Sequence, residues 1–308
     1  MGKLAFMFPG QGAQYTGMGR DFYEKEASAR EMMDKAGWIT GLDIPALCFE
    51  ENERLSVTEY TQIAMIAVEA AILKVLEERG IKPDVAAGLS LGEYGAIIAA
   101  GAVRPEEAFA IVRRRGIYMQ EAVPQGGAMA AVMGADTGII EEVCAQTEGT
   151  VSIANYNCPG QIVITGEADA VAKAGEALKA RGARRIVPLK VSGPFHSCLL
   201  EGAGERLRKD LDKAQFGELA IPYVANLTAE YVTNTGDIKD LLQKQVSSPV
   251  KWQQSVEQMI AGGVDTFVEI GPGKTLCGFV KKIDKQARVL SVDKYEDLAV
   301  CMEALANA

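Results

Sequence analysis

The sequence predicts an α/β fold in which a mainly parallel sheet is interrupted by a smaller inserted domain. Short apolar segments alternate with longer helical patterns towards both ends of the chain, as in a sheet covered by helices. Between residues 126 and 191 the order changes to strand, helix, strand, strand, helix, strand, which is typical of the ferredoxin-like fold. The chain has 308 residues, 48% of them hydrophobic, so disulfide or metal support is unnecessary.

The N-terminal part begins with an apolar run at 3–8, which predicts a buried strand that ends in a glycine-rich turn. Ser56 and Glu59 have the spacing of a capping box, and apolar residues then recur at helical intervals. We therefore expect an amphipathic helix that ends before Gly80. A second short strand at 84–88, a tight turn and another apolar helix follow.

The inserted domain is expected to cover residues 126–191, and the larger domain residues 1–125 and 192–308. Glycine and proline near both boundaries suit hinges. The predicted elements of the insert are strand 128–133, helix 136–146, strand 151–157, strand 161–166, helix 168–181 and strand 184–190. A late strand at 266–270 returns to the larger sheet. The segment after it lacks the first glycine of a phosphate loop, so we expect an ordinary strand-to-helix turn.

The composition argues against several classes of function. A net charge of −9 opposes a general phosphate-binding surface, so nucleic-acid binding is not expected. The six cysteines form no CxxC pair, which favours reduced thiols in a cytoplasmic protein. His196 is the only histidine, which excludes a metal site built on paired imidazoles, and no metal is expected. We expect neither a signal peptide nor a membrane span.

A GxSxG pentapeptide places Ser90 between Gly88 and Gly92, after a predicted strand and before a predicted helix. This is the setting of a nucleophile elbow, in which the glycines permit a strained turn and the helix amides stabilise an oxyanion. The serine needs a base, and His196 offers the one imidazole of the chain. Chance occurrence of the pentapeptide and a histidine satisfied by packing are the alternatives.

Arg115 lies in a run of three arginines but differs from its neighbours in helical phase. If Pro105 starts a helix, Ala108, Ile111, Val112 and Arg115 share one apolar face. A buried guanidinium is costly unless it meets an anion, and its fork matches a carboxylate. A structural ion pair or a snorkelling side chain would also explain the position. If Arg115 instead points to Ser90, the acyl substrate carries a carboxylate.

With these residues assembled, the chain closely resembles malonyl-CoA:acyl carrier protein transacylases of bacterial fatty acid synthesis. The likeness runs nearly end to end, in six motifs that occur in family order. They are FPGQGAQ at 8–14, GLSLGEY at 88–94, RG with MQE from 115 to 121, NCPGQ at 157–161, GPFHS at 193–197, and Gln245 with Pro249, Val250 and Trp252. One departure is Leu89, where many relatives have histidine.

The resemblance implies a hydrolase-like α/β core with the ferredoxin-like insert, and a ping-pong transfer without a cofactor. Ser90 would be the nucleophile and His196 the general base and then acid, oriented by the main-chain carbonyl of Gln245. The amides of Gln11 and Leu91 would form the oxyanion hole. Arg115 would hold the malonyl carboxylate. Malonyl-CoA and acyl carrier protein are the implied partners, and a monomer is expected.

Two other functions use some of the same residues. A serine esterase or thioesterase would need an acidic triad member and has no use for a buried arginine. A carrier-binding scaffold without activity would not need both Ser90 and His196. An acyltransferase of a polyketide pathway is a further alternative. Because carrier proteins of this pathway are generally acidic, docking requires a local basic patch. The candidates are Arg113, Arg114, Lys190, Lys281, Lys282 and Lys285.

Overall fold

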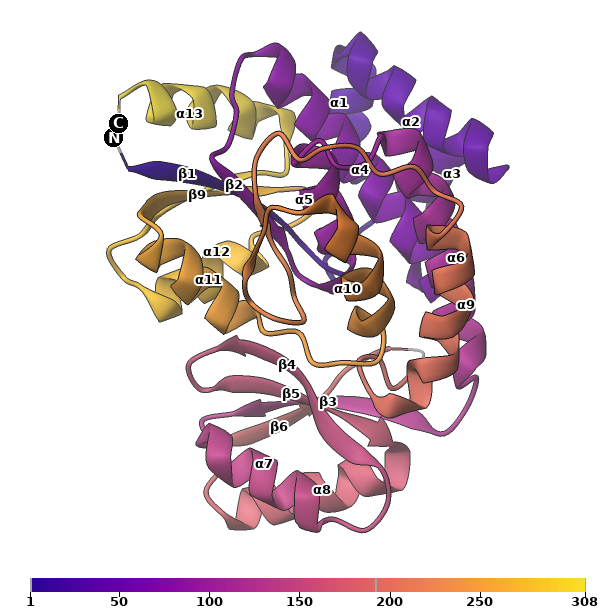
Figure 1. Ribbon diagram of the computed structural model, residues 1–308, viewed down its shortest axis with the longest axis vertical. Coiled ribbons are helices and arrows are strands. Elements are labelled where there is room, and N and C mark those ends of the chain that lie inside the picture. The colour runs from indigo at the N-terminus through magenta and orange to yellow at the C-terminus, as the bar shows by residue number, and fades with distance from the viewer. Residues whose placement is uncertain (1, 192, 308) are drawn as a thin grey trace.

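The computed structural model describes residues 2–191 and 193–307, which form a large α/β part and a smaller lobe (Figure 1). The larger sheet has six strands in the order β10-β9-β1-β2-β7-β8. All neighbouring pairs are parallel except β7 with β8. The α/β fold class with a mainly parallel sheet is therefore confirmed. The strands are β1 (Lys3–Phe8), β2 (Val85–Gly88), β7 (Tyr223–Val224), β8 (Tyr231–Val232), β9 (Val264–Ile270) and β10 (Arg288–Val292).

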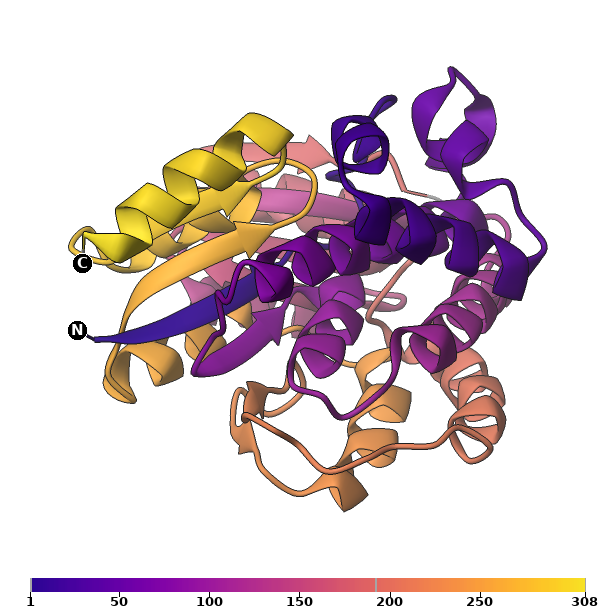
Figure 2. The ribbon, with the colours of Figure 1, turned by 90° about the horizontal axis from the view of Figure 1, so that it is seen from above.

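Both faces of this sheet are covered by helices, as the nearly continuous apolar sequence of its strands requires. In β1, Phe6 and Phe8 pack on one face with α4 (Thr58–Glu78), whereas Ala5 and Met7 pack on the other with α11 (Trp252–Ala261) and α12 (Thr275–Ile283). Figure 2 shows these layers from above. The helices of this part are α1 (Arg20–Lys25), α2 (Ala27–Thr40), α3 (Ile44–Phe49), α4 (Thr58–Glu78), α5 (Glu93–Ala99), α6 (Pro105–Ala122), α9 (Glu201–Leu211), α10 (Ile238–Gln245), α11 (Trp252–Ala261), α12 (Thr275–Ile283) and α13 (Tyr295–Ala306).

The predicted start and character of helix α4 are wrong. Ser56 lies in a separate 3-10 turn, and Val57 precedes the helix without any side-chain cap. Asn52 caps that preceding turn instead, through a hydrogen bond from the Leu55 amide of 2.9 Å. The helix is also buried around most of its circumference, because it lies between the sheet and the outer helices rather than at the surface. Its internal position even encloses the carboxyl group of Glu69, which is 0% exposed.

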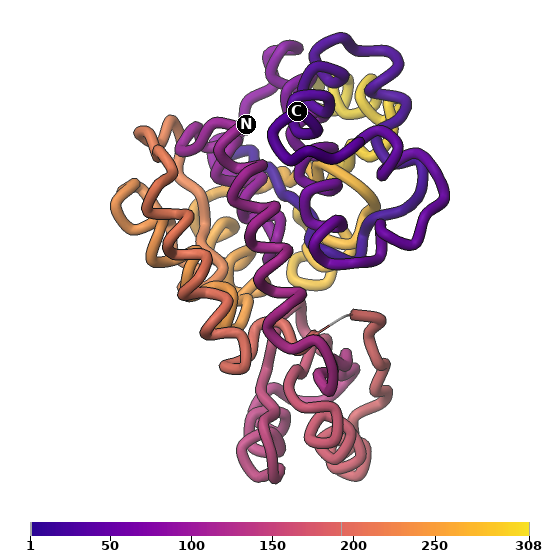
Figure 3. Tube along the Cα trace, turned by 90° about the vertical axis from the view of Figure 1, so that its right-hand side faces the viewer, coloured from indigo at the N-terminus to yellow at the C-terminus, as the bar shows by residue number. Residues whose placement is uncertain are grey.

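The smaller lobe lies at the lower end of the molecule in Figure 3. It has an antiparallel sheet in the order β4-β5-β3-β6. The order along the chain is β3 (Gly127–Met133), α7 (Thr137–Gln146), β4 (Val151–Cys158), β5 (Gln161–Glu167), α8 (Ala168–Ala180) and β6 (Arg185–Pro188). This is the ferredoxin-like order predicted from the sequence. The domain boundaries remain a prediction, and the one placed at Ser192 lies outside the described residues.

The two parts meet along strand β4. The Tyr156 amide donates to the Val250 carbonyl over 2.9 Å, and the Val250 amide donates to the Ala154 carbonyl over 2.8 Å. Since Val250 follows α10, this contact ties the smaller lobe to the segment that carries Gln245. Over residues 2–191 and 193–307, the helices are too short or too polar for one to span a bilayer.

Candidate active site

Ser90 occupies a strained turn between β2 and α5. Its φ angle is 54°, in the left-handed region that non-glycine residues rarely adopt. No side chain fits at Gly88 or Gly92, the two glycines that flank this turn. A Cβ at Gly88 would lie 1.9 Å from the Gly92 carbonyl oxygen, and one at Gly92 would lie 2.0 Å from the Phe8 carbonyl oxygen. The pentapeptide therefore forms an elbow that raises Ser90 above the carboxyl end of the sheet.

The Ser90 hydroxyl meets the imidazole of His196. The Oγ to Nε2 distance is 2.7 Å. His196 Nδ1 lies 2.9 Å from the main-chain oxygen of Gln245 and 3.1 Å from that of Ser248. Because a carbonyl oxygen only accepts, Nδ1 must carry the proton, which leaves Nε2 free to accept from the serine. The two carbonyls thus set the tautomer that a general base requires.

His196 is held neutral by its surroundings. Only 3% of its surface is exposed, and its pKa is lowered from 6.5 to about 4, mainly by burial. The positive charge of Arg115 contributes to this lowering of the pKa, and the hydrogen bonds to the Gln245 and Ser248 carbonyls partly oppose it. An unprotonated imidazole is ready to take the Ser90 proton at neutral pH. The backbone of His196 also has positive φ, at 62°.

Arg115 is buried and faces Ser90. This is one of the positions that its helical phase allows. It is 1% exposed, and its Nη2 donates to Ser90 Oγ at 3.3 Å and to Gln245 Oε1 at 3.0 Å. Both partners are neutral. Within the described chain, no carboxylate oxygen forms an ion pair with this guanidinium. A desolvated cation with neutral partners is well placed to attract an anion, and burial lowers its pKa.

The remaining predicted site residues lie beside the elbow. Leu91 is fully buried in the short 3-10 turn that begins at Ser90. Gln11 follows Gly10, at which a Cβ would lie only 2.6 Å from the Leu89 carbonyl oxygen. The loop that bears Gln11 therefore runs against the residue before the serine. The Gln11 side chain donates to Thr58 Oγ1 over 3.1 Å, which anchors this loop to α4.

Two residues that sequence reasoning did not select complete the site. Asn226 Oδ1 accepts from the Ser90 amide at 2.6 Å, and its Nδ2 donates to the Gly88 carbonyl at 2.6 Å. Glu93, at the start of α5, is 1% exposed and accepts from Gln245 Nε2 at 2.8 Å. Burial raises the pKa of Glu93 to about 7, although Gln245, Asn226 and Arg115 lower it. Glu93 could have been found as the one charge in an apolar stretch, but no local pattern marks Asn226.

Among the basic residues considered for docking, Arg113 is not free. It forms an ion pair with Glu59 at 2.8 Å and lies over the Tyr60 ring at 5.0 Å from the centroid. Arg114 is exposed on the same helix, and Lys190 is exposed beyond β6. Lys281 and Lys282 are exposed and donate to main-chain or amide oxygens.

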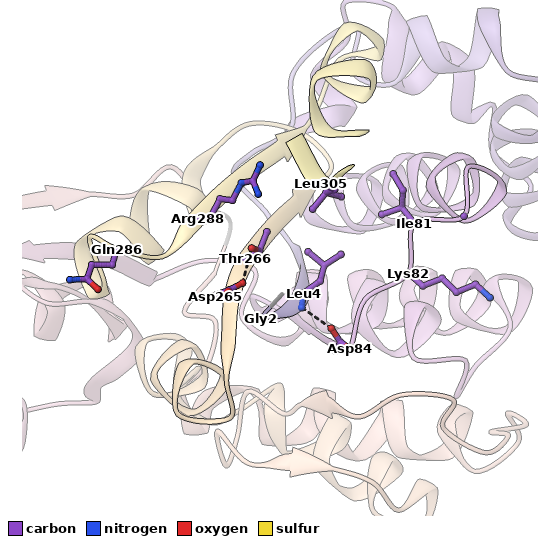
Figure 4. Close-up of a pocket in the computed structure, with 11 residues that line it drawn as sticks. Gly2, Leu4, Ile81, Lys82, Asp84, Asp265, Thr266, Gln286, Arg288 and Leu305 are labelled. Atoms are coloured by element: carbon purple, nitrogen blue, oxygen red, sulfur yellow. Dashed lines mark hydrogen bonds between the residues drawn. The ribbon is translucent and has the colours of Figure 1, made fainter. Parts of the chain in front are cut away.

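A cavity of about 750 Å³ lies at the opposite, amino edge of the larger sheet (Figure 4). Its charged residues include Asp84, which accepts from the Leu4 amide at 2.7 Å, and Asp265, which accepts from Thr266 at 2.8 Å. Of the residues that the structure describes, those lining this cavity include none of the predicted site residues. The cavity therefore supplies no group to the serine chemistry.

Comparison with known proteins decides the family. The family model described as acyl transferase domain matches residues 5–300. The chain belongs to the acyl transferase family. The match covers nearly the whole length of this acyl transferase, so both the larger sheet and the antiparallel lobe belong to one family unit. The family resemblance inferred from the motifs is confirmed.

Relatives of this acyl transferase share its full length. It is 43% identical over 310 residues to the malonyl CoA-acyl carrier protein transacylase of Bacillus subtilis, with 99% of this chain and 98% of the relative covered. The crystal structure of malonyl CoA-acyl carrier protein transacylase from Clostridium perfringens is similar at a TM-score of 0.95 and 42% identity, covering 99% and 98% of the two chains.

A third similar structure contains a partner. It is described as a type II PKS acyl-carrier protein in complex with its malonyl-transacylase. That transacylase is 37% identical to this acyl transferase at a TM-score of 0.95, with 98% of this chain and 99% of the other covered.

Proposed function

We propose that this acyl transferase moves the malonyl group of malonyl-CoA to the phosphopantetheine thiol of acyl carrier protein, through an ester on Ser90. The observation that carries the proposal is the buried Arg115 guanidinium, 3.3 Å from Ser90 Oγ and without a carboxylate partner among the described residues. One methylene separates the carboxylate of a malonyl group from its thioester carbonyl. An acyl group attached to Ser90 therefore brings its carboxylate within reach of Arg115.

The first half-reaction forms the ester. His196 Nε2 takes the proton of Ser90 Oγ as the oxygen attacks the thioester carbonyl of malonyl-CoA. The amides of Gln11 and Leu91 are the proposed donors to the oxyanion of the tetrahedral intermediate. When the C–S bond breaks, His196 returns the proton to the departing coenzyme A sulfur. Charge on the imidazolium is stabilised by the carbonyls of Gln245 and Ser248.

The second half-reaction repeats these steps with the carrier thiol. His196 takes the thiol proton, the sulfur attacks the Ser90 ester, and the proton returns to Ser90 Oγ as malonyl carrier protein leaves. Binding of the phosphopantetheine arm positions the thiol at the ester, which gives it an advantage over water. No cofactor takes part. The product supplies fatty acid synthesis, and we place the protein in the cytoplasm.

The arrangement of His196 favours transfer over a serine hydrolase with an acidic triad member. Its Nδ1 contacts two main-chain carbonyls, at 2.9 and 3.1 Å, in the place where such a hydrolase has a carboxylate. The carrier protein of a polyketide pathway is a second candidate acceptor, because a similar transacylase is complexed with one.

The proposal is tested by incubating the protein with malonyl-CoA and measuring its intact mass. A malonyl adduct is expected on the wild type and absent from Ser90→Ala. Addition of carrier protein bearing its phosphopantetheine arm should then transfer the adduct to the carrier. Loss of the adduct to water without carrier acylation would establish a hydrolase, and absence of any adduct would contradict the function. Carriers of fatty acid and polyketide synthesis, compared side by side, identify the acceptor.

A further inference from the structure

Gln245 forms hydrogen bonds with four residues of the candidate site: His196, Arg115, Ser90 and Glu93. Its main-chain carbonyl accepts from His196, and its side-chain Oε1 accepts from Arg115 Nη2 at 3.0 Å. Its Nε2 donates to the Ser90 carbonyl at 2.7 Å and to Glu93 Oε2 at 2.8 Å. The side chain is 1% exposed, so water does not compete for these contacts. The direction of this one amide group therefore decides what Arg115 meets.

Three neighbours favour one direction of this amide: Arg115 faces its oxygen, and the Ser90 carbonyl and the Glu93 carboxylate face its NH₂ group. In its ionised form, which a pH above about 7 favours, the Glu93 carboxylate only accepts hydrogen bonds, so it requires the NH₂ end of Gln245 to face it. If the amide turned over, its NH₂ would meet the guanidinium, which only donates, and its oxygen would meet Glu93 and the Ser90 carbonyl, which only accept. Burial makes each such mismatch costly. Glu93 Oε2 also accepts from the main-chain amide of Asn226 at 3.3 Å. The side chain of Asn226 hydrogen-bonds with the main chain of Ser90 and Gly88, so the Glu93 carboxylate is also connected to the turn that carries Ser90.

We propose that Glu93 is a positioning residue that fixes the Gln245 amide and, through it, directs Arg115 towards the carboxylate of the acyl substrate. Among the described residues, the Glu93 carboxylate hydrogen-bonds with Gln245 and Asn226, and not with Ser90 Oγ or His196. It acts on Gln245, and Gln245 in turn positions Arg115, the donor proposed to bind the malonyl carboxylate. This inference rests on the proposed function, because it concerns how that site recognises a malonyl group.

The proposal predicts a loss that depends on the acyl group. Glu93→Ala removes no group that the proposed chemistry uses, but it takes away one of the two acceptors that hold the Gln245 Nε2. We expect kcat/KM for malonyl-CoA to fall about 10- to 100-fold, the range expected when a substrate-positioning group is displaced by about 1 Å. Acylation of Ser90 by acetyl-CoA, which has no carboxylate, should change by less than about threefold. Glu93→Gln, which can still present an oxygen to Gln245, should lie between the wild type and Glu93→Ala.

Two further variants separate positioning from general damage. Gln245→Met keeps the main-chain carbonyl for His196 and removes the amide, so it should reproduce the selective malonyl loss. The double variant Glu93→Ala with Gln245→Met should lose no more malonyl transfer than the more impaired single variant. Both substitutions interrupt the same hydrogen bonds, from Glu93 through Gln245 to Arg115. Glu205→Ala, at an exposed position of α9, is the matched control and should leave both substrates unaffected. Equal losses for malonyl and acetyl transfer, or additive losses in the double variant, would overturn the proposal.

A crystal structure of Glu93→Ala gives a readout that does not depend on the identity of the substrate. The Gln245 side chain is expected to move so that Oε1 leaves hydrogen-bond distance of Arg115 Nη2. If the Gln245 amide instead keeps its place on Arg115, the positioning role is refuted even where malonyl adducts form. If the amide moves as expected but wild-type protein forms no malonyl adduct, the positioning role stands and the proposed function fails.

Discussion

Replacement of Arg115 by alanine tests the carboxylate clamp most directly. The side chain is 1% exposed and its Nη2 lies 3.3 Å from Ser90 Oγ, so the substitution removes the buried cation closest to the bound acyl group. Breaking one partner of a buried charge pair costs about 3 to 5 kcal/mol. Since about 1.36 kcal/mol is a factor of ten in rate, malonyl transfer should fall by roughly 2.2 to 3.7 powers of ten.

Transfer of an acetyl group should respond quite differently to the same substitution. Acetyl has no carboxylate to lose, and removal of the nearby positive charge relieves its lowering of the His196 pKa. Acetyl transfer should therefore fall far less, or improve. The assay follows acylation of Ser90 by each coenzyme A ester, with thermal unfolding to verify the fold. Lys209→Ala, which removes an exposed positive charge from α9, is the control. Equal losses for the two acyl groups would refute the clamp.

Three further predictions concern proton binding, burial and the elbow. Because the chain has one histidine, NMR can titrate His196 without ambiguity, and its pKa should be about 4 and should rise in Arg115→Ala. This folded-state pKa lies below 6.5, so the unfolded chain binds the proton first as the pH is lowered. The free energy of unfolding should therefore fall as pH drops from about 6.5 to about 4. A measured His196 pKa near 6.5 would contradict this prediction. Burial raises the pKa of Glu69 well above 4.5, so the native state keeps a proton that the unfolded chain releases, and stability should fall as pH rises above 4.5. Glu69→Met should raise the free energy of unfolding at pH 7 by about 1 to 3 kcal/mol in urea titrations, and no gain would refute the cost assigned to this carboxyl. Gly92→Ala should lower the free energy of unfolding by about 1 to 3 kcal/mol and abolish most Ser90 acylation, because its Cβ would lie 2.0 Å from a main-chain oxygen. Gly278→Ala, which has open space around the new Cβ, should be tolerated.

Much of the fold was readable from local patterns. The strand at 3–8, the turn after β9 and the ferredoxin-like order of the insert all appear as predicted, because each depends on periodicity or turn chemistry within a short window. The capping box at Ser56 was wrong for the opposite reason. The spacing was present, but the chain uses Asn52 to cap a separate turn, and packing rather than capping determines where α4 begins.

The candidate site likewise contains residues that local sequence patterns predict and residues that only packing brings together. Ser90 could be selected from its glycines, His196 because the chain has no other imidazole, and Arg115 from helical phase. Glu93 and Asn226 could not be assigned in this way. A lone buried carboxyl in an apolar stretch has many structural explanations, and an asparagine carries no periodic signal. Only the tertiary structure shows which groups they contact.

The sequence by itself therefore determined the fold class, the family resemblance and the three residues on which the chemistry is proposed to depend. Only the tertiary structure decided how those residues are oriented. Asn226 reaches Ser90 across 136 residues of chain, and Gln245 reaches it across 155. Hydrogen bonds of this kind form between segments that are brought together by burial of the sheet and its helices. The direction of a buried amide or imidazole is then selected by whichever donors and acceptors surround it, and no local stretch of sequence contains that information.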